Sequence, residues 1–225
     1  MNNSVAQTVE EQLVRVPAGA VTLEGNLTLP QDSHGIVLFA HGSGSSRHSP
    51  RNRYVARVLN EAKLATLLID LLTPHEELID ARTAQLRFDI ELLAERLVDA
   101  TDWLTQFPDT KDLPIGYFGA STGAAAALVA AAVRPEVVGA IVLRGGRPDL
   151  AGAALMRVRA PTLLIVGEND GQVIQLNREA LAQLRCEKQL MIVPGATHLF
   201  EEPGALDVVA RLASDWFERH LVPLG

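Results

Sequence analysis

The spacing of apolar residues changes several times along the chain, and each change predicts a new element. Residues 12–16 and 20–29 alternate apolar and polar side chains on either side of Pro17-Ala18-Gly19, which predicts an antiparallel hairpin. From Gly35 onward, short and largely apolar runs take over, as is typical of strands covered on both faces of a parallel sheet. These runs span residues 36–40, 65–72, 114–118, 137–143, 161–166 and 189–193.

Helical spacing of apolar residues fills most of the gaps between the predicted strands. A hairpin followed by repeated strand–helix units predicts an α/β fold, with a mostly parallel sheet and helices on both faces. We expect one domain over residues 12–225, preceded by a flexible tail at 1–11, and a polar connection at 74–80. The expected helices span residues 52–62, 82–105 (a long crossover helix), 124–133, 175–184 and 205–220.

The composition excludes several functional classes. A formal charge of −7 gives no basic field, so we expect neither a nucleic-acid partner nor a membrane partner. The single cysteine, Cys186, cannot form an internal disulfide and fits a reducing compartment. Residues 1–11 lack the apolar core of a secretory signal, and the longest apolar run, 124–133, is too short to span a bilayer. We therefore expect a cytoplasmic protein.

The chemistry is concentrated at Gly119-Ala120-Ser121-Thr122-Gly123, between a predicted strand and a predicted helix. Gly-x-Ser-x-Gly in this position is the pattern of a nucleophile elbow, in which the serine occupies a sharp, strained turn and the glycines avoid collisions. The helix that follows adds a positive dipole end where an oxyanion would develop. The alternative is that Ser121 is an ordinary helix N-cap.

A serine hydroxyl is a weak nucleophile, so it needs a base, and the base needs an orienting group. Asp170 and His198 each follow a predicted strand, and ligands of parallel sheets bind beyond the carboxyl ends of the strands. Ser121, Asp170 and His198 therefore form a candidate catalytic triad. Asp149 is the competing acid, since Asp170 could instead be a turn residue and His198 an ordinary loop histidine. His41, at the end of a strand, is expected to be buried and structural.

Four motifs now carry a family resemblance: His41-Gly42-Ser43-Gly44, the elbow, Gly167-Glu168-Asn169-Asp170 and Gly195-Ala196-Thr197-His198. Over residues 14–221 the chain resembles the α/β-hydrolase superfamily, and within it the small esterases similar to dienelactone hydrolase. Dienelactone hydrolases proper use cysteine at the elbow, whereas this chain has Ser121. The resemblance implies an oxyanion hole formed by the backbone N–H groups of Thr122 and Ser43.

The expected activity is hydrolysis of a small-molecule carboxylic ester, thioester or lactone. No large cap domain is expected, because the connection between the predicted strands at 137–143 and 161–166 is short, although residues 71–80 and 150–157 could partly cover the site. No metal or cofactor is expected, because the chain has no metal-spaced His/Cys set and no Walker motif. Candidate substrate contacts are Gly44, Arg47, Arg144 and Arg147, and salt bridges are the alternative role of the arginines.

Two other functions stay open from the sequence. An acyltransferase or perhydrolase could use the same triad, because these activities differ from hydrolysis only in the acceptor. A non-catalytic ligand-binding protein could retain the fold.

Overall fold

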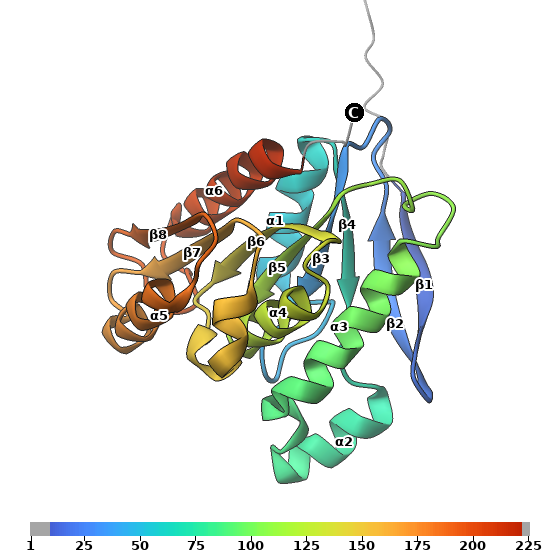
Figure 1. Cartoon of the computed structure of the whole chain (residues 1–225), viewed down its shortest axis with the longest axis horizontal. Coiled ribbons are helices and arrows are strands. Elements are labelled where there is room, and N and C mark those ends of the chain that lie inside the picture. The colour runs from blue at the N-terminus through green and yellow to red at the C-terminus, as the bar shows by residue number, and fades with distance from the viewer. Residues whose placement is uncertain (1–9, 222–225) are drawn as a thin grey trace, which may run out of the picture.

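Eight strands form one sheet in the computed structural model, which describes residues 10–221 (Figure 1). The strand order is β1-β2-β4-β3-β5-β6-β7-β8, and β3 to β8 pair in parallel. The predicted α/β-hydrolase architecture, a mostly parallel sheet with an antiparallel hairpin at its N-terminal edge and no large cap domain, is confirmed. The strands are β1 (Glu11–Ala18), β2 (Val21–Thr28), β3 (Gly35–Ala40), β4 (Leu64–Ile69), β5 (Ile115–Ala120), β6 (Val138–Arg144), β7 (Thr162–Gly167) and β8 (Lys188–Val193).

The hairpin pairs Ala18 with Val21, so its turn consists of Gly19 and Ala20. Gly19 has a φ of 56°, which an L-residue adopts only with strain and which explains the glycine at this position. Strand β2 also pairs with β4 in antiparallel orientation and so joins the hairpin to the parallel part of the sheet. Residues 1–9 of the expected N-terminal tail lie outside the described residues, and Glu11 already belongs to β1.

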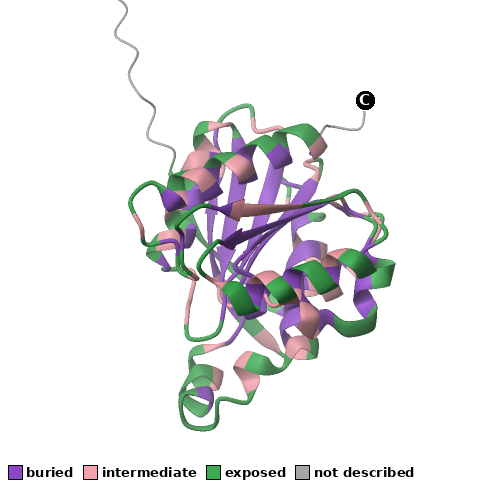
Figure 2. Ribbon diagram, turned by 90° about the vertical axis from the view of Figure 1, so that its left-hand side faces the viewer, coloured by how far each residue is buried: buried purple, intermediate pink, exposed green. Residues whose placement is uncertain are grey.

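Helices cover both faces of the sheet, and strands β3 to β7 are almost wholly buried (Figure 2). One face packs against α1 (Pro50–Glu61) and α6 (Ala205–His220), and the other against α3 (Ile90–Leu104), α4 (Thr122–Val133) and α5 (Gly171–Gln183). Complete burial of a side chain such as Phe118 in β5 contributes about 1.5–3 kcal/mol. Strand β5 lies between β3 and β6, so the elbow that follows it is anchored at the middle of the sheet.

Two expectations about residues 74–105 were wrong. Residues 74–80 are not a polar connection but most of helix α2 (Pro74–Thr83). Thr73 and Glu76 form a reciprocal capping box, with Pro74 in the first turn, and this local chemistry starts the helix. The long crossover helix is also broken, because Ala84 ends α2 in a left-handed conformation and Asp89 caps a separate helix, α3.

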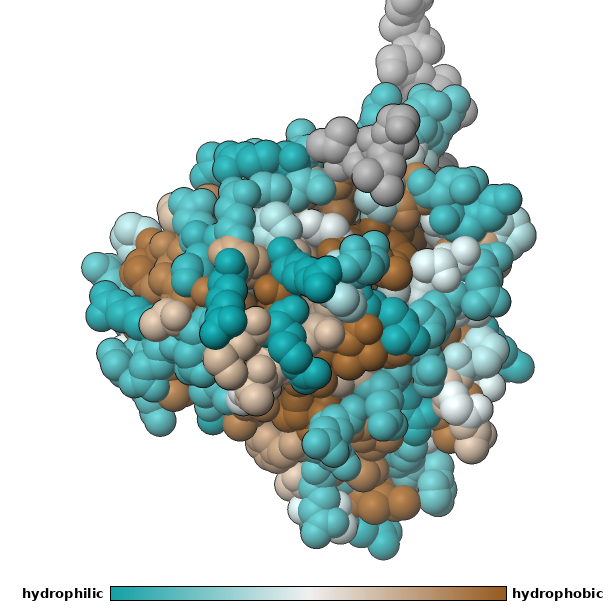
Figure 3. Space-filling model, viewed as in Figure 1, coloured by the Kyte–Doolittle hydropathy of each residue, from teal (hydrophilic) through white to brown (hydrophobic). Residues whose placement is uncertain are grey.

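Helix α2 and the short 3-10 helix η1 (Leu86–Phe88) project from the rest of the molecule (Figure 1). An ion pair between Glu76 and Arg96 joins the projection to α3, a second between Asp80 and Arg87 joins α2 to η1, and Leu86 packs against the core. Its tip exposes apolar side chains, which contribute to the brown surface at the lower end of Figure 3. These exposed side chains are Leu78, Ile79 and Phe88.

Candidate active site

Ser121 lies at the junction of β5 and α4 in a conformation that serine rarely adopts, with φ 51° and ψ −121°. Such strain costs on the order of 1–3 kcal/mol and persists only where the surroundings enforce it. The two glycines of the motif explain why this tight turn is possible. A Cβ on Gly119 would lie 2.7 Å from Ala124 Cα, and one on Gly123 would lie 2.2 Å from the Ala40 carbonyl oxygen.

The alternative role of Ser121, as an ordinary N-cap, does not fit this geometry. Ser121 does precede the first residue of α4, but its side chain makes no capping hydrogen bond. Its backbone is held instead by β6 and the loop that follows, because Ser121 N–H donates to the Arg144 carbonyl (3.3 Å) and its own carbonyl accepts from Arg147 N–H (3.0 Å). The hydroxyl group is therefore not committed to the helix terminus.

His198 and Asp170 meet beyond the ends of β8 and β7. His198 Nδ1 lies 2.6 Å from Asp170 Oδ2, a short hydrogen bond in which the ring nitrogen donates to the carboxylate. Asp170 is well covered, with 15% of its side chain exposed, whereas the His198 side chain is 40% exposed. One end of the imidazole is thus fixed by a carboxylate while the ring remains accessible.

The two loops that carry this pair are tied together by their backbones. Asn169 N–H donates to the Ala196 carbonyl (2.9 Å), and Gly195 N–H donates to the Glu168 carboxylate (2.8 Å). Gly167 allows this approach, because a Cβ there would lie 2.4 Å from the Ala196 oxygen. The Asp170–His198 contact therefore rests on an ordered pair of loops.

The imidazole packs against Gly145, at the exit of β6. A Cβ on Gly145 would lie 3.4 Å from His198 Nδ1. Gly145 directly follows Arg144, whose carbonyl accepts the hydrogen bond from Ser121 N–H. Within residues 10–221 no hydrogen bond joins Ser121 Oγ to His198 Nε2. Catalytic hydrogen bonds are often long or poorly aligned before substrate binds and tighten in the complex with substrate.

The loop after β3 lies against Ser121 on the opposite side of β5 from β6. A Cβ on Gly42 would lie 2.8 Å from Ser121 Cβ, so the two backbones are in van der Waals contact. In the described part of the chain, neither Ser43 N–H nor Thr122 N–H donates a hydrogen bond. Thr122 is the first residue of α4, where backbone N–H groups have no partner within the helix.

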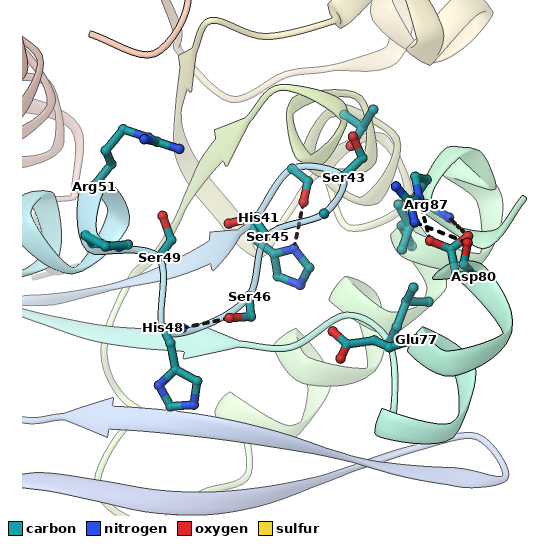
Figure 4. A pocket seen from close by; sticks show the side chains of 16 residues that line it. His41, Ser43, Ser45, Ser46, His48, Ser49, Arg51, Glu77, Asp80 and Arg87 are labelled. Atoms are coloured by element: carbon teal, nitrogen blue, oxygen red, sulfur yellow. Dashed lines mark hydrogen bonds and ion pairs between the residues drawn. The ribbon is translucent and has the colours of Figure 1, made fainter. Parts of the chain in front are cut away.

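A pocket of about 590 Å³ opens beside this loop (Figure 4). Residues 42–46 and Thr122 form one wall, so both candidate oxyanion donors border it. The opposite wall belongs to the α2–η1 projection and presents Glu77, Asp80 and Arg87. Leu72 and Leu93 add apolar surface. The expectation that residues 71–80 partly cover the site agrees with this wall, whereas residues 150–157 do not line the pocket.

Several pocket residues were missed by the sequence analysis. The projection supplies Glu77, Asp80 and Arg87, and the first turn of α1 supplies Arg51. A signal was present for the first group, because Thr73-Pro74-His75-Glu76 reads as a helix start. No local signal indicates that this helix faces the loop at 42–46, since that contact depends on the tertiary fold.

The candidate arginines have different surroundings. Arg47 forms ion pairs with Asp70 and Glu24, and Arg147 forms a double hydrogen bond with Asp149 (2.9 and 2.8 Å). Both arginines thus have the salt-bridge role that was the alternative to substrate contact. Asp149, the competing acid, is engaged by Arg147, whereas Asp170 is the carboxylate at His198.

Arg144 is buried and poorly paired. It is 8% exposed. The only hydrogen bond of its guanidinium among the described residues is a long one (3.4 Å) to the Asn52 side chain, which leaves Nε and one terminal nitrogen without a partner. Burial lowers the pKa of Arg144 to about 10, and the nearby charge of Arg51 acts in the same direction. Gly44, the remaining candidate contact, lines the pocket.

No group of three or more His, Cys, Asp or Glu side chains is arranged to hold a metal ion within residues 10–221. Over the same residues, no helix is both long enough and apolar enough to cross a membrane.

The sequence profile of the Dienelactone hydrolase family matches residues 65–222. The chain belongs to this family. A crystal structure of dienelactone hydrolase from Anabaena variabilis shares 66% sequence identity, covers 95% of this chain and 99% of its own, and superposes with a TM-score of 0.93. Est1E from Butyrivibrio proteoclasticus, at 15% identity over 92% of this chain and 98% of its own (TM-score 0.76), shares the fold.

Two proteins of Mycobacterium tuberculosis, from strains CDC 1551 and H37Rv, are 61% identical to this chain over 217 residues. Both are named "Putative phosphoribosyl transferase". The match covers 96% of this chain but 48% of each relative, so the chain spans about half the length of these proteins. Membership in the Dienelactone hydrolase family supports a hydrolase for the segment that these proteins share with this chain.

Proposed function

We propose that this chain is a serine hydrolase that cleaves a carboxylic ester, thioester or lactone through an acyl-enzyme on Ser121. The observation that carries the proposal is the His198–Asp170 hydrogen bond of 2.6 Å, formed at the same edge of the sheet as the strained serine. A strained serine at a strand-to-helix turn and a histidine whose Nδ1 donates to a carboxylate are components of a Ser-His-Asp mechanism.

In the proposed mechanism, Ser121 Oγ attacks the carbonyl carbon while His198 Nε2 accepts the hydroxyl proton. Asp170 keeps the proton on Nδ1 and stabilises the imidazolium that forms. The carbonyl oxygen becomes an oxyanion held by the N–H groups of Ser43 and Thr122, and each such donor typically contributes about 3 kcal/mol. His198 then protonates the leaving alcohol or thiol, and a water molecule, activated by the same imidazole, releases the acid from Ser121.

We propose that the substrate occupies the pocket, whose lining includes both proposed oxyanion donors, Ser43 and Thr122, but neither Ser121 nor His198. A cavity of about 590 Å³ suits a small ester or lactone, with Leu72 and Leu93 for apolar groups and the backbone of Gly44 for close approach. We propose no substrate contact for the three candidate arginines, because Arg47 and Arg147 are neutralised by carboxylates and Arg144 is buried and does not line the pocket. The name phosphoribosyl transferase belongs to proteins about twice as long, and we do not extend it to this chain.

The test is intact-mass labelling with a small fluorophosphonate. The wild type should gain one adduct, Ser121→Ala should gain none, and Ser45→Ala, which removes a pocket hydroxyl near the same loop, should label as the wild type does. A folded wild type that gains no adduct would refute the proposal and favour a non-catalytic ligand-binding protein. Product analysis with added alcohol or peroxide then separates hydrolysis from acyl transfer and perhydrolysis.

A further inference from the structure

His41 is buried at the end of β3 with both of its ring nitrogens engaged. Nδ1 lies 3.0 Å from the carbonyl oxygen of Gly42, and Nε2 lies 3.0 Å from the backbone nitrogen of Leu71 (Figure 4 shows the first of these contacts). The ring therefore bridges the loop after β3 and the chain segment that leaves β4. The side chain is 8% exposed, so solvent does not compete for either bond.

These two partners define the proton positions on the ring. A backbone N–H can only donate, so Nε2 must be the acceptor for Leu71 and carries no proton. A carbonyl can only accept, so Nδ1 must carry the proton that is donated to Gly42. Only the neutral ring with its proton on Nδ1 satisfies both contacts, because an imidazolium would direct a second N–H at the N–H of Leu71.

The surroundings favour this neutral form. Burial lowers the pKa of His41, and this effect outweighs the Gly42 carbonyl and the carboxylates of Asp70 and Glu77, which act in the opposite direction. Asp70 is itself neutralised by Arg47. Of the other charges that border the same pocket, Asp80 and Arg87 are paired with each other, and Arg51 is paired with Glu201.

The bond to Gly42 has a consequence for the residue that follows. The carbonyl of Gly42 and the N–H of Ser43 belong to the same planar peptide group and point in opposite directions. Gly42 oxygen accepts hydrogen bonds from His41 and from Ser45 N–H (3.2 Å), so the plane of this peptide group is fixed from one side. Fixing that plane also fixes the direction of Ser43 N–H, beside Ser121.

We propose that His41 is a positioning residue: it holds the Gly42–Ser43 peptide so that Ser43 N–H faces the oxyanion that forms on the substrate. This role rests on the proposed function, in which Ser43 supplies one of the two donors. His41 does not contact the substrate and takes up no proton during the reaction.

The test compares His41→Leu, which removes both ring hydrogen bonds, with His41→Asn, whose side-chain amide can still donate to Gly42. Each variant is assayed with a p-nitrophenyl ester and with its thiono analogue, in which sulfur, a weak acceptor, replaces the carbonyl oxygen. For the oxygen ester, His41→Leu should lower kcat about 100-fold with KM within about twofold, since removal of one oxyanion donor costs roughly 10²–10³ in kcat. The loss with the thiono ester should be much smaller. With the oxygen ester, kcat of His41→Asn should be at least tenfold higher than kcat of His41→Leu.

Equal losses with both esters in a folded His41→Leu protein would overturn the proposal, because a general structural defect does not distinguish oxygen from sulfur. Nitrogen NMR of the wild-type ring is an independent check that needs no variant: a proton on Nε2 would also refute it. Fluorophosphonate labelling distinguishes a failure of the proposed function from a failure of the role proposed for His41. A labelled wild type with an unimpaired His41→Leu variant refutes only the role of His41, whereas an unlabelled wild type removes the proposed function and this role together.

Discussion

Replacing Gly42 with alanine should push the oxyanion loop and the proposed nucleophile apart. The added Cβ would lie 2.8 Å from Ser121 Cβ and 3.1 Å from the Ala120 oxygen. Carbon atoms pack at about 3.5–4.0 Å, so a separation of at least about 0.7 Å must open. The elbow is held on its other side by β6 and the loop that follows, because Ser121 N–H donates to the Arg144 carbonyl and the Ser121 carbonyl accepts from Arg147 N–H. The shift therefore falls on the geometry between Ser121 and the loop.

A misplacement of about 1 Å can lower a rate about 100-fold, so a shift of about 0.7 Å predicts a loss of roughly 30- to 100-fold in kcat/KM. This corresponds to about 2–3 kcal/mol of transition-state stabilisation. The assay is steady-state hydrolysis of a short p-nitrophenyl ester. The control is Gly171→Ala, because a Cβ there meets nothing within 4 Å and its backbone is not left-handed. That variant should keep kcat/KM within twofold. A Gly42→Ala protein as active as the wild type would show that the loop and Ser121 do not act as one site.

Three further outcomes are expected. Asp170→Asn should lower kcat by roughly 10⁴-fold in the same assay, whereas Asp149→Asn should change it only a few-fold; the reverse order would make Asp149 the orienting acid. Arg144→Met should raise the free energy of unfolding by about 1 kcal/mol in urea titrations, because it removes a buried, poorly paired charge. A variant less stable than the wild type would show that the guanidinium has a stronger partner than Asn52. The pKa of His41 is lowered on folding, so its contribution to stability should be complete above about pH 6.5 and be lost as the pH falls through its folded-state pKa. The difference in urea midpoint between wild type and His41→Gln should therefore shrink between pH 7.5 and 5, and a constant difference would contradict the argument.

The sheet could be predicted from the sequence because its strands are buried on both faces. A strand such as β3 or β7 has no exposed residue, so it appears as an unbroken apolar run between polar segments. The elbow could be predicted because its constraint is local: the two glycines that relieve the collisions stand two residues on either side of Ser121. Both signals lie within a few neighbouring positions of the chain.

The break between α2 and α3 was missed for a physical reason. Leu86, Ile90, Leu93 and Leu97 continue a helical spacing across the break, so periodicity alone predicts one helix. The structure ends the first helix at Ala84 and starts the next at Asp89, through conformations that the apolar pattern does not encode. The capping residues were present in the sequence, and they were the better signal here.

The partners of the charged residues could not be read from the sequence at all. Arg47 contacts Asp70, 23 positions away, and both Asp149 and Asp170 follow strands that end at the same edge of the sheet. Asp170 reaches His198 because β7 and β8 are adjacent in the sheet and because Gly167 allows close contact between the loops that follow them. The candidate acid was therefore a choice between two residues until the tertiary arrangement was known.

The proposed site also depends on glycines that lie outside the elbow motif. Gly42 lies against Ser121, Gly145 against the His198 ring and Gly167 against the loop of His198, and each belongs to a different strand exit. The Gly-x-Ser-x-Gly pattern specifies only the turn at Ser121. The distance from that turn to the proposed base and to the proposed oxyanion donors is set by backbone approaches that a Cβ would disturb. Substitutions at Gly42 and Gly145 should therefore impair the chemistry as directly as changes within the elbow, although neither residue carries a functional group.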